Sequence, residues 1–298
     1  MAHITLLDGS IGQELVKRSK AAPTPLWSTQ VMVDAPELVG AVHADYFAVG
    51  ATIATTNSYA LHRSRLAPVG LEDQLANLIQ TSLTQARAAR DAAGHGRVAG
   101  ALGPLLASYR PDLTPDPMLA ATRYAEIVRL MAGQVDLYLI ETVSSILEAE
   151  GALRGCTAAD APVWLALTVM DDDGTRLRSG EDLADIAPFI AQFQPDAVLI
   201  NCSRPEAIPA ALNVIAGYGR PYGAYANGFT RISDEFLKDR PTVAALEARV
   251  DLNPAAYARL AMDWVEQGAT IVGGCCEVGP AHIAELARQL RVAGHVIV

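Results

Sequence analysis

The sequence predicts an α/β fold, and within that class a single (β/α)8 barrel of the TIM type that occupies residues 1–298. Three observations lead to this prediction. Short apolar runs recur eight times along the chain, longer segments with helical spacing lie between them, and the length of 298 residues suits one barrel. An open doubly wound sheet is the alternative that the same alternation allows. No shift in composition marks a second domain.

The apolar runs are predicted to be buried strands. Each run is too short for a typical helix, and several are rich in Val, Ile, Thr or aromatic residues. The eight predicted strands cover residues 4–8, 51–57, 98–103, 136–141, 163–168, 196–201, 222–227 and 270–274. Because strands that alternate with helices run parallel, we expect all of their carboxyl ends on one face of the barrel.

The segments between these runs have apolar residues at helical spacing. The longest covers 71–93, and others cover 205–217, 254–268 and 280–290. Pro280 suits a first helical turn, and two of the segments end in glycine, which is a common helix stop.

Two connections are longer than the rest, at 104–116 and 228–253. Both are expected on the face where the strands end, either as lids over a site or as surface decoration.

The composition excludes several classes of protein. Hydrophobic residues make up 51% of the chain and charged residues 19%, which is too apolar for a disordered protein. The net charge of −10 argues against a nucleic-acid partner. The first residues do not form a signal peptide, and no apolar stretch approaches the roughly 18 residues of a membrane span. We therefore expect a soluble cytoplasmic protein whose four cysteines are reduced thiols. Its oligomeric state stays open.

Polar residues follow most of the predicted strands at the point where each strand ends. They are Asp8, Asn57, Glu141, Asn201, Cys202, Asn227, Cys275 and Cys276. In a barrel these positions all face the usual active-site mouth. One polar residue after a strand means little, but six such strand ends with three thiols among them predict a functional site.

The cysteines are the sharpest part of this pattern. Cys275 and Cys276 are adjacent and follow two glycines that permit a tight turn, while Cys202 ends the sixth strand. Three thiolates that converge at one barrel mouth predict a zinc site at the carboxyl-terminal face of the strands. The alternative is three small buried side chains that only pack. Cys156 lies late in a predicted helix and is expected only to pack.

Three protein ligands leave a fourth position on zinc open, which is typical of a catalytic site. A thiolate-rich zinc is a weak activator of water, but it can bind an incoming thiol and keep it deprotonated. A free thiol has a pKa of about 8.5 and is mostly protonated at neutral pH. The predicted chemistry is therefore alkylation of a metal-held sulfur.

Several segments resemble the homocysteine S-methyltransferase family. TIVGGCCEVGPAHIAEL (270–286) is similar to the family's carboxyl-terminal zinc motif, LINCS (199–203) to its first zinc-cysteine motif, and LLDGSIGQEL (6–15) to its amino-terminal Asp-Gly motif. Residues 25–59, 103–109, 140–149 and 225–229 match further segments in the expected order. The resemblance covers nearly the whole chain.

The resemblance implies zinc-dependent transfer of a methyl group to homocysteine, with methionine as the product. Cys202, Cys275 and Cys276 would bind Zn²⁺. Asp8 and Gly9 match residues that hold the amino-acid part of homocysteine, and Glu141 matches the carboxylate that pairs with its ammonium group.

Other residues are assigned more loosely. Asn201 is expected either to orient Cys202, to act as a transient oxygen ligand, or to cap a strand. Asn57, Tyr59 and Trp27 are expected to line the pocket.

The chain departs from the family's pattern at Gly9-Ser10 and at 103–107, where a methyl donor would lie. The first choice of donor is a sulfonium, either S-methylmethionine or S-adenosylmethionine. Betaine is an alternative, and its quaternary ammonium would need an aromatic cage. Two other classes stay open: a non-catalytic zinc- or thiol-binding barrel, and a metal-dependent hydrolase or lyase.

Overall fold

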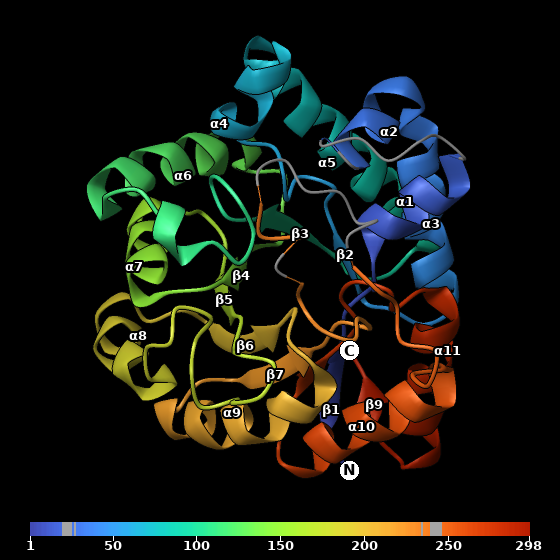
Figure 1. Cartoon of the computed structure of the whole chain (residues 1–298). Coiled ribbons are helices and arrows are strands. Elements are labelled where there is room, and N and C mark those ends of the chain that lie inside the picture. Colours follow the sequence, from blue (N-terminus) through green and yellow to red (C-terminus); the bar gives the residue numbers. More distant parts are fainter. Residues whose placement is uncertain (20–25, 27, 234, 239–245) are drawn as a thin grey trace.

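The chain forms an α/β fold around a curled parallel sheet (Figure 1), as seen in a computed structural model that describes residues 1–19, 26, 28–233, 235–238 and 246–298. Nine strands lie within these residues: β1 (His3–Leu6), β2 (Ile53–Thr55), β3 (Arg97–Leu102), β4 (Leu137–Val143), β5 (Val163–Leu167), β6 (Ala197–Asn201), β7 (Tyr222–Tyr225), β8 (Ile271–Val272) and β9 (Val296–Ile297). Each of the first eight overlaps one of the eight predicted strands, with ends that differ by up to two residues.

The strand order is β2-β3-β4-β5-β6-β7-β8-β1-β9, and every pairing is parallel. The order follows the chain from β2 to β8 and then returns to β1. At the seam between β1 and β2, the amide of Thr52, just before β2, donates to the Leu6 carbonyl oxygen at 2.7 Å. β9 was not predicted, because a strand of two residues has too little pattern to recognise.

Helices surround the sheet (Figure 1). Those described are α1 (Ile11–Ser19), α2 (Ser28–Asp34), α3 (Pro36–Ala48), α4 (Arg63–Leu66), α5 (Leu75–Ala93), α6 (Pro117–Met131), α7 (Ile146–Gly155), α8 (Ala187–Phe193), α9 (Ile208–Ile215), α10 (Pro254–Glu266) and α11 (Pro280–Val292). The predicted helix at 280–290 corresponds to α11, and that at 254–268 to α10. The segment 205–217 is shorter as an α-helix than predicted, because turns of 3₁₀ helix flank α9 on both sides.

Both faces of the sheet are buried, as the continuous apolar runs predict. Alternate residues of each strand point to opposite faces. Leu137 and Leu139 of β4 pack in a cluster that contains strand residues from around the sheet, whereas Tyr138 and Ile140 pack in the larger cluster that includes the helices. The sheet therefore has a filled interior and a second core between strands and helices.

Side-chain caps fix the starts of α6, α7 and α10. Asp116 accepts a hydrogen bond from the Met118 amide at the start of α6, Ser145 from the Glu148 amide at the start of α7, and Asn253 from the Ala256 amide at the start of α10. Such caps satisfy amide groups that have no partner inside the helix. Among the described residues, no helix combines the length and apolar character that a bilayer crossing requires.

Candidate active site

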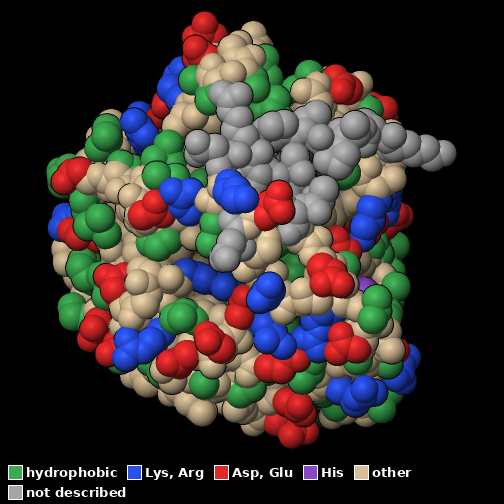
Figure 2. All heavy atoms as spheres, viewed as in Figure 1, with side chains coloured by type: hydrophobic (Ala, Val, Ile, Leu, Met, Phe, Trp, Pro, Cys, Tyr) green, Lys and Arg blue, Asp and Glu red, His purple; other side chains and the backbone are tan. Residues whose placement is uncertain are grey.

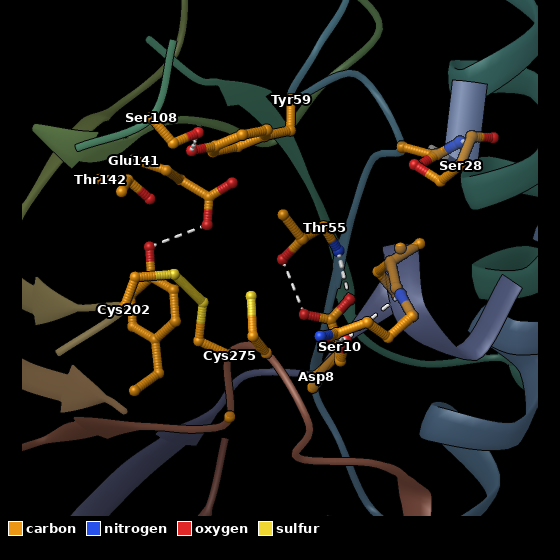
Figure 3. A pocket seen from close by; sticks show the side chains of 18 of the residues that line it. Asp8, Ser10, Ser28, Thr55, Tyr59, Ser108, Glu141, Thr142, Cys202 and Cys275 are labelled. Atoms are coloured by element: carbon orange, nitrogen blue, oxygen red, sulfur yellow. Dashed lines mark hydrogen bonds between the residues drawn. A yellow bond between two sulfur atoms is a disulfide. The ribbon is translucent and has the colours of Figure 1, made fainter. Parts of the chain in front are cut away.

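A pocket opens at the carboxyl ends of the strands and brings together most of the residues that the sequence singled out. Its volume is about 120 Å³, which is room for several water molecules or a small amino acid. Eight predicted residues line it: Asp8, Gly9, Asn57, Tyr59, Glu141, Cys202, Cys275 and Cys276. Figure 3 shows the Asp8 and Glu141 carboxyl groups and the cysteine sulfur atoms around the same space. Trp27, which was also expected there, lies outside the described residues.

The three grouped cysteines meet at this pocket. The Sγ atoms of Cys202, Cys275 and Cys276 all lie within 4.8 Å of one another. Cys202 and Cys275 are joined in a disulfide with Cα atoms 5.7 Å apart, and Cys276 is a free thiol. The expectation of four reduced thiols is therefore wrong for these two, because their strand ends come within disulfide reach. Cys156 is buried in the helix-side core, as expected.

Cys202 follows the last residue of β6 with an unusual backbone. Its φ of 47° is left-handed, which costs a residue other than glycine about 1–3 kcal/mol unless neighbours hold it. The Cys202 carbonyl oxygen accepts hydrogen bonds from Asn227 Nδ2 at 2.9 Å and from Thr168 Oγ1 at 3.3 Å. Asn227, predicted as a strand-end residue, therefore supports the Cys202 backbone and is absent from the pocket-lining residues.

Asp8 is buried and held from the neighbouring strand. Its Oδ1 accepts from Thr55 Oγ1 at 2.7 Å and its Oδ2 from the Thr55 amide at 2.6 Å. Burial, with a smaller contribution from the negative charge of Glu141, raises the pKa of Asp8 to about 8 although both bonds from Thr55 oppose the shift. A positively charged ligand would therefore stabilise the ionised form of this buried carboxyl group.

Glu141 lies in β4, across the pocket from Asp8 (Figure 3). Its Oε1 accepts a hydrogen bond from the Tyr225 hydroxyl at 2.9 Å. Burial raises the pKa of Glu141 to about 7, and the bond from Tyr225 partly offsets this. Together, Asp8 and Glu141 form an acidic pair suited to a ligand ammonium group. The sequence did not single out Tyr225 or Thr55, since a buried strand Tyr or Thr is ordinary.

A β-bulge directs Glu141 toward the pocket. The register of β4 against β5 shifts between Ile140 and Val143, and Thr142 within the shift has a φ of 61°. Asn201 holds this bulge: its Oδ1 accepts from the Thr142 amide at 2.9 Å and its Nδ2 donates to Thr142 Oγ1 at 3.0 Å. Asn201 is fully buried and is not among the residues that line the pocket. The structure thus places it behind Glu141.

Gly9 and Asn57 complete the predicted set. A Cβ atom at Gly9 would collide with the Val278 carbonyl oxygen, so close packing requires glycine there. Asn57 Nδ2 donates to the Ser28 carbonyl oxygen at 3.2 Å and so ties the end of β2 to the start of α2.

Gln13 was missed by the sequence analysis, although it lines the pocket. Its Oε1 accepts from Ser10 Oγ at 2.5 Å and from the Glu277 amide at 2.8 Å, while its buried Nε2 has no hydrogen-bond partner among the residues that the structure describes. A glutamine in an ordinary helix carries no sequence signal for such a place.

The two long connections meet beside the pocket. Tyr109, in the connection after β3, packs edge-on against Phe236, in the connection after β7, with ring centroids 6.0 Å apart. Both rings line the pocket, and the Tyr59 hydroxyl lies 2.7 Å from Ser108 Oγ. Residues 234 and 239–245 of the second connection lie outside the described residues. The described parts therefore form an aromatic wall of the pocket.

These features define an α/β enzyme with a thiol cluster and two buried carboxyl groups at the ends of its strands. A model of the family described as homocysteine S-methyltransferase matches residues 5–290. The homocysteine S-methyltransferase of Escherichia coli (strain K12) is 32% identical over 304 residues, which cover 95% of this chain and 94% of that protein.

Solved structures agree with this match. The metallated form of the homocysteine methyltransferase MmuM from Escherichia coli superimposes with a TM-score of 0.80 at 31% identity, covering 96% of both chains. The oxidised form of MmuM gives a TM-score of 0.79 at 32% identity, again over 96% of both chains. The chain belongs to the homocysteine S-methyltransferase family and is a methyltransferase.

Proposed function

We propose that this protein transfers a methyl group from a sulfonium donor to the thiol of homocysteine, with methionine as the product. The observation that carries the proposal is the cluster of three cysteine sulfur atoms within 4.8 Å, set beside two buried carboxyl groups in one pocket. The cluster suits a sulfur nucleophile, and the carboxyl groups suit an ammonium group.

We infer that the curled sheet is a (β/α)8 barrel with β9 as an addition outside β1. The strand order runs once around from β2 to β1, and the bond from the Thr52 amide to the Leu6 carbonyl oxygen joins the remaining edges. This arrangement supports the placement of the site at the carboxyl-terminal mouth.

The donor set fits Zn²⁺. Cys202, Cys275 and Cys276 offer three sulfur ligands at one point once the disulfide is reduced to two thiols. Bound there, zinc would supply a fourth position in which the acceptor sulfur stays deprotonated.

The amino-acid end of homocysteine would lie against Asp8 and Glu141. Each carboxyl group has a pKa raised by burial, so an ammonium group between them would favour their ionised forms. The bonds from Thr55 and Tyr225 keep the two groups oriented before the ligand arrives. Binding would thereby fix the sulfur at a set distance from the cysteines, and such positioning lowers the barrier to transfer.

The methyl donor would approach along the aromatic wall of Tyr59, Tyr109 and Phe236. Aromatic faces attract cations. In the transfer, a bond forms between the acceptor sulfur and the methyl carbon, and the bond from that carbon to the sulfonium sulfur breaks. The sulfonium leaves as a neutral thioether, and the acceptor's thiol proton passes to solvent. Betaine remains the second cationic donor that this wall suits.

The test is methionine formation by reduced, zinc-loaded protein with homocysteine and one of four donors: S-methylmethionine, S-adenosylmethionine, betaine or a methylfolate. Turnover with a sulfonium donor is expected. Turnover only with betaine or methylfolate would overturn the assignment of a sulfonium compound as the donor. Bound zinc and bound homocysteine without turnover on any donor would point to a non-catalytic thiol-binding protein.

A further inference from the structure

A short hairpin follows β5 and carries a nearly buried ion pair. Val169 and Leu177 form an antiparallel bridge, and the Met170 amide donates to the Arg176 carbonyl oxygen at 2.9 Å. Within the hairpin, Arg178 Nη2 lies 2.7 Å from Asp171 Oδ1, and the two side chains are only 10% and 17% exposed. Neither Arg178 nor Asp171 was predicted from the sequence as a site residue.

Arg178 reaches the backbone of a predicted zinc ligand. Its Nη2 lies 3.4 Å from the Cys202 carbonyl oxygen, and its Nε lies 3.4 Å from Thr168 Oγ1. With Asn227 and Thr168, the guanidinium group is the third donor that converges on this carbonyl oxygen. The three donors therefore support the left-handed conformation of Cys202.

The same guanidinium group also supports the aromatic wall. Its Cζ atom lies 5.1 Å from the centroid of the Tyr109 ring, a cation–π distance. Tyr109 in turn packs against Phe236. On the other side of the ion pair, Asp171 Oδ2 accepts a hydrogen bond from the Ile232 amide at 3.1 Å. The pair thus contacts the end of β6 and both long connections.

We propose that Arg178 and Asp171 are positioning residues that hold Cys202 in a ligand-ready geometry and fix the aromatic wall of the pocket. Neither residue is among those that line the pocket in the described chain, so they would act through Cys202, Tyr109 and Ile232. A planar guanidinium group can serve a carboxylate, a carbonyl oxygen and a ring face at once, which a lysine ammonium cannot. This inference rests on the proposed function, because it assumes that Cys202 binds zinc.

The experiment compares zinc affinity and steady-state kinetics of Arg178→Met, Arg178→Lys and Asp171→Asn with those of the unaltered protein, all reduced. The matched control is Arg176→Met: Arg176 lies on the same hairpin and pairs with Asp173 and Asp182, away from Cys202. Zinc affinity is measured by competition with a chromophoric chelator. Thermal unfolding of each variant separates a general loss of stability from a loss of metal.

We expect Arg178→Met to weaken zinc binding about 10- to 100-fold, the range seen when partners of a metal ligand are removed. Arg178→Lys is expected to fall between this variant and the unaltered protein. Asp171→Asn is expected to raise the KM for the donor more than it lowers kcat, because it loosens the wall. Arg176→Met is expected to stay within about twofold of the unaltered protein in both measurements.

The positioning role would be overturned if Arg178→Met kept a zinc affinity within about twofold of that of the unaltered protein. It would also be overturned if Arg176→Met lost as much zinc affinity as Arg178→Met. If Arg178→Met does not fold, Arg178→Lys with full zinc affinity and an unchanged donor KM would overturn it as well. Failure of the unaltered protein itself to bind zinc would overturn the proposed function, and this inference with it.

Discussion

Residues with a left-handed backbone gather at the pocket. Of the five described residues other than glycine with positive φ, Tyr109, Thr142 and Cys202 line the pocket and Glu277 follows Cys276. Each costs about 1–3 kcal/mol unless its surroundings hold it. Hydrogen bonds to Thr142 and to the Cys202 carbonyl oxygen provide such support. The backbone is therefore constrained where the reacting groups would be placed.

The acidic pair is tested by Glu141→Gln. On the proposed binding mode, loss of this carboxylate would remove a charged partner of the ligand ammonium group, and such bonds contribute about 1.5–3 kcal/mol. We expect the homocysteine dissociation constant to rise about 10- to 100-fold, measured by calorimetric titration. Tyr225→Phe removes only the bond to Glu141 and is expected to have a smaller effect. Unchanged affinity in Glu141→Gln would remove Glu141 from the acceptor site.

The stability of the ligand-free protein is expected to fall as pH rises. Burial raises the folded-state pKa of Asp8 to about 8 and of Glu141 to about 7, whereas both titrate near pH 4 in an unfolded chain. Between about pH 4 and 8 the folded protein therefore binds more protons than the unfolded chain. The stability that these protons contribute is complete below about pH 4 and is lost as pH rises through 7 to 8.

This pH dependence is measured as the free energy of unfolding in denaturant at pH 5 and pH 8. Between pH 5 and pH 8, the free energy of unfolding of the unaltered protein is expected to fall. In the double variant with Asp8→Asn and Glu141→Gln, the fall is expected to be smaller by at least about 1 kcal/mol. Identical losses in the two proteins would contradict the raised pKa values.

At the scale of elements, the bulge in β4 makes Asn201 a support for Glu141. Asn201→Ala leaves Thr142 without two hydrogen bonds and is expected to weaken homocysteine binding several-fold. Zinc affinity is expected to stay within about twofold of the unaltered protein. Chelator competition and calorimetry measure the two effects on the same sample. A large loss of zinc instead would favour the alternative in which Asn201 orients or replaces a metal ligand.

Regular elements were predictable from sequence, and local irregularities were not. The apolar runs located β1 to β8, and proline and glycine marked the ends of α10 and α11. The predicted site contains Asp8, Glu141 and the three cysteines, because carboxyl and thiol side chains at the ends of several strands are recognisable in the sequence. The bulge at Thr142 and the contacts of Arg178 depend on pairings between distant segments, which no local pattern encodes. The disulfide likewise depends on the approach of two strand ends.

At the scale of the whole molecule, the disulfide and the proposed metal site exclude each other. The oxidised protein keeps two of its four cysteines as thiols, Cys156 and Cys276. We expect the oxidised protein to bind no zinc at this site and the reduced protein to bind one ion per chain, measured by metal analysis after gel filtration. Cys275→Ser is expected to abolish zinc retention even when reduced. Full occupancy in that variant would refute the ligand assignment.

β1 pairs with β8 on one side, and at the seam between β1 and β2 the Thr52 amide bonds to the Leu6 carbonyl oxygen while Asp8 accepts two bonds from Thr55. A ligand that binds Asp8 would therefore stabilise the contact between β1 and β2 as well as fill the pocket. Amide hydrogen exchange measures this effect of ligand binding on the two strands. On addition of homocysteine, the amides of Thr52 and Thr55 are expected to exchange more slowly, whereas amides of β9 are expected to keep their rates.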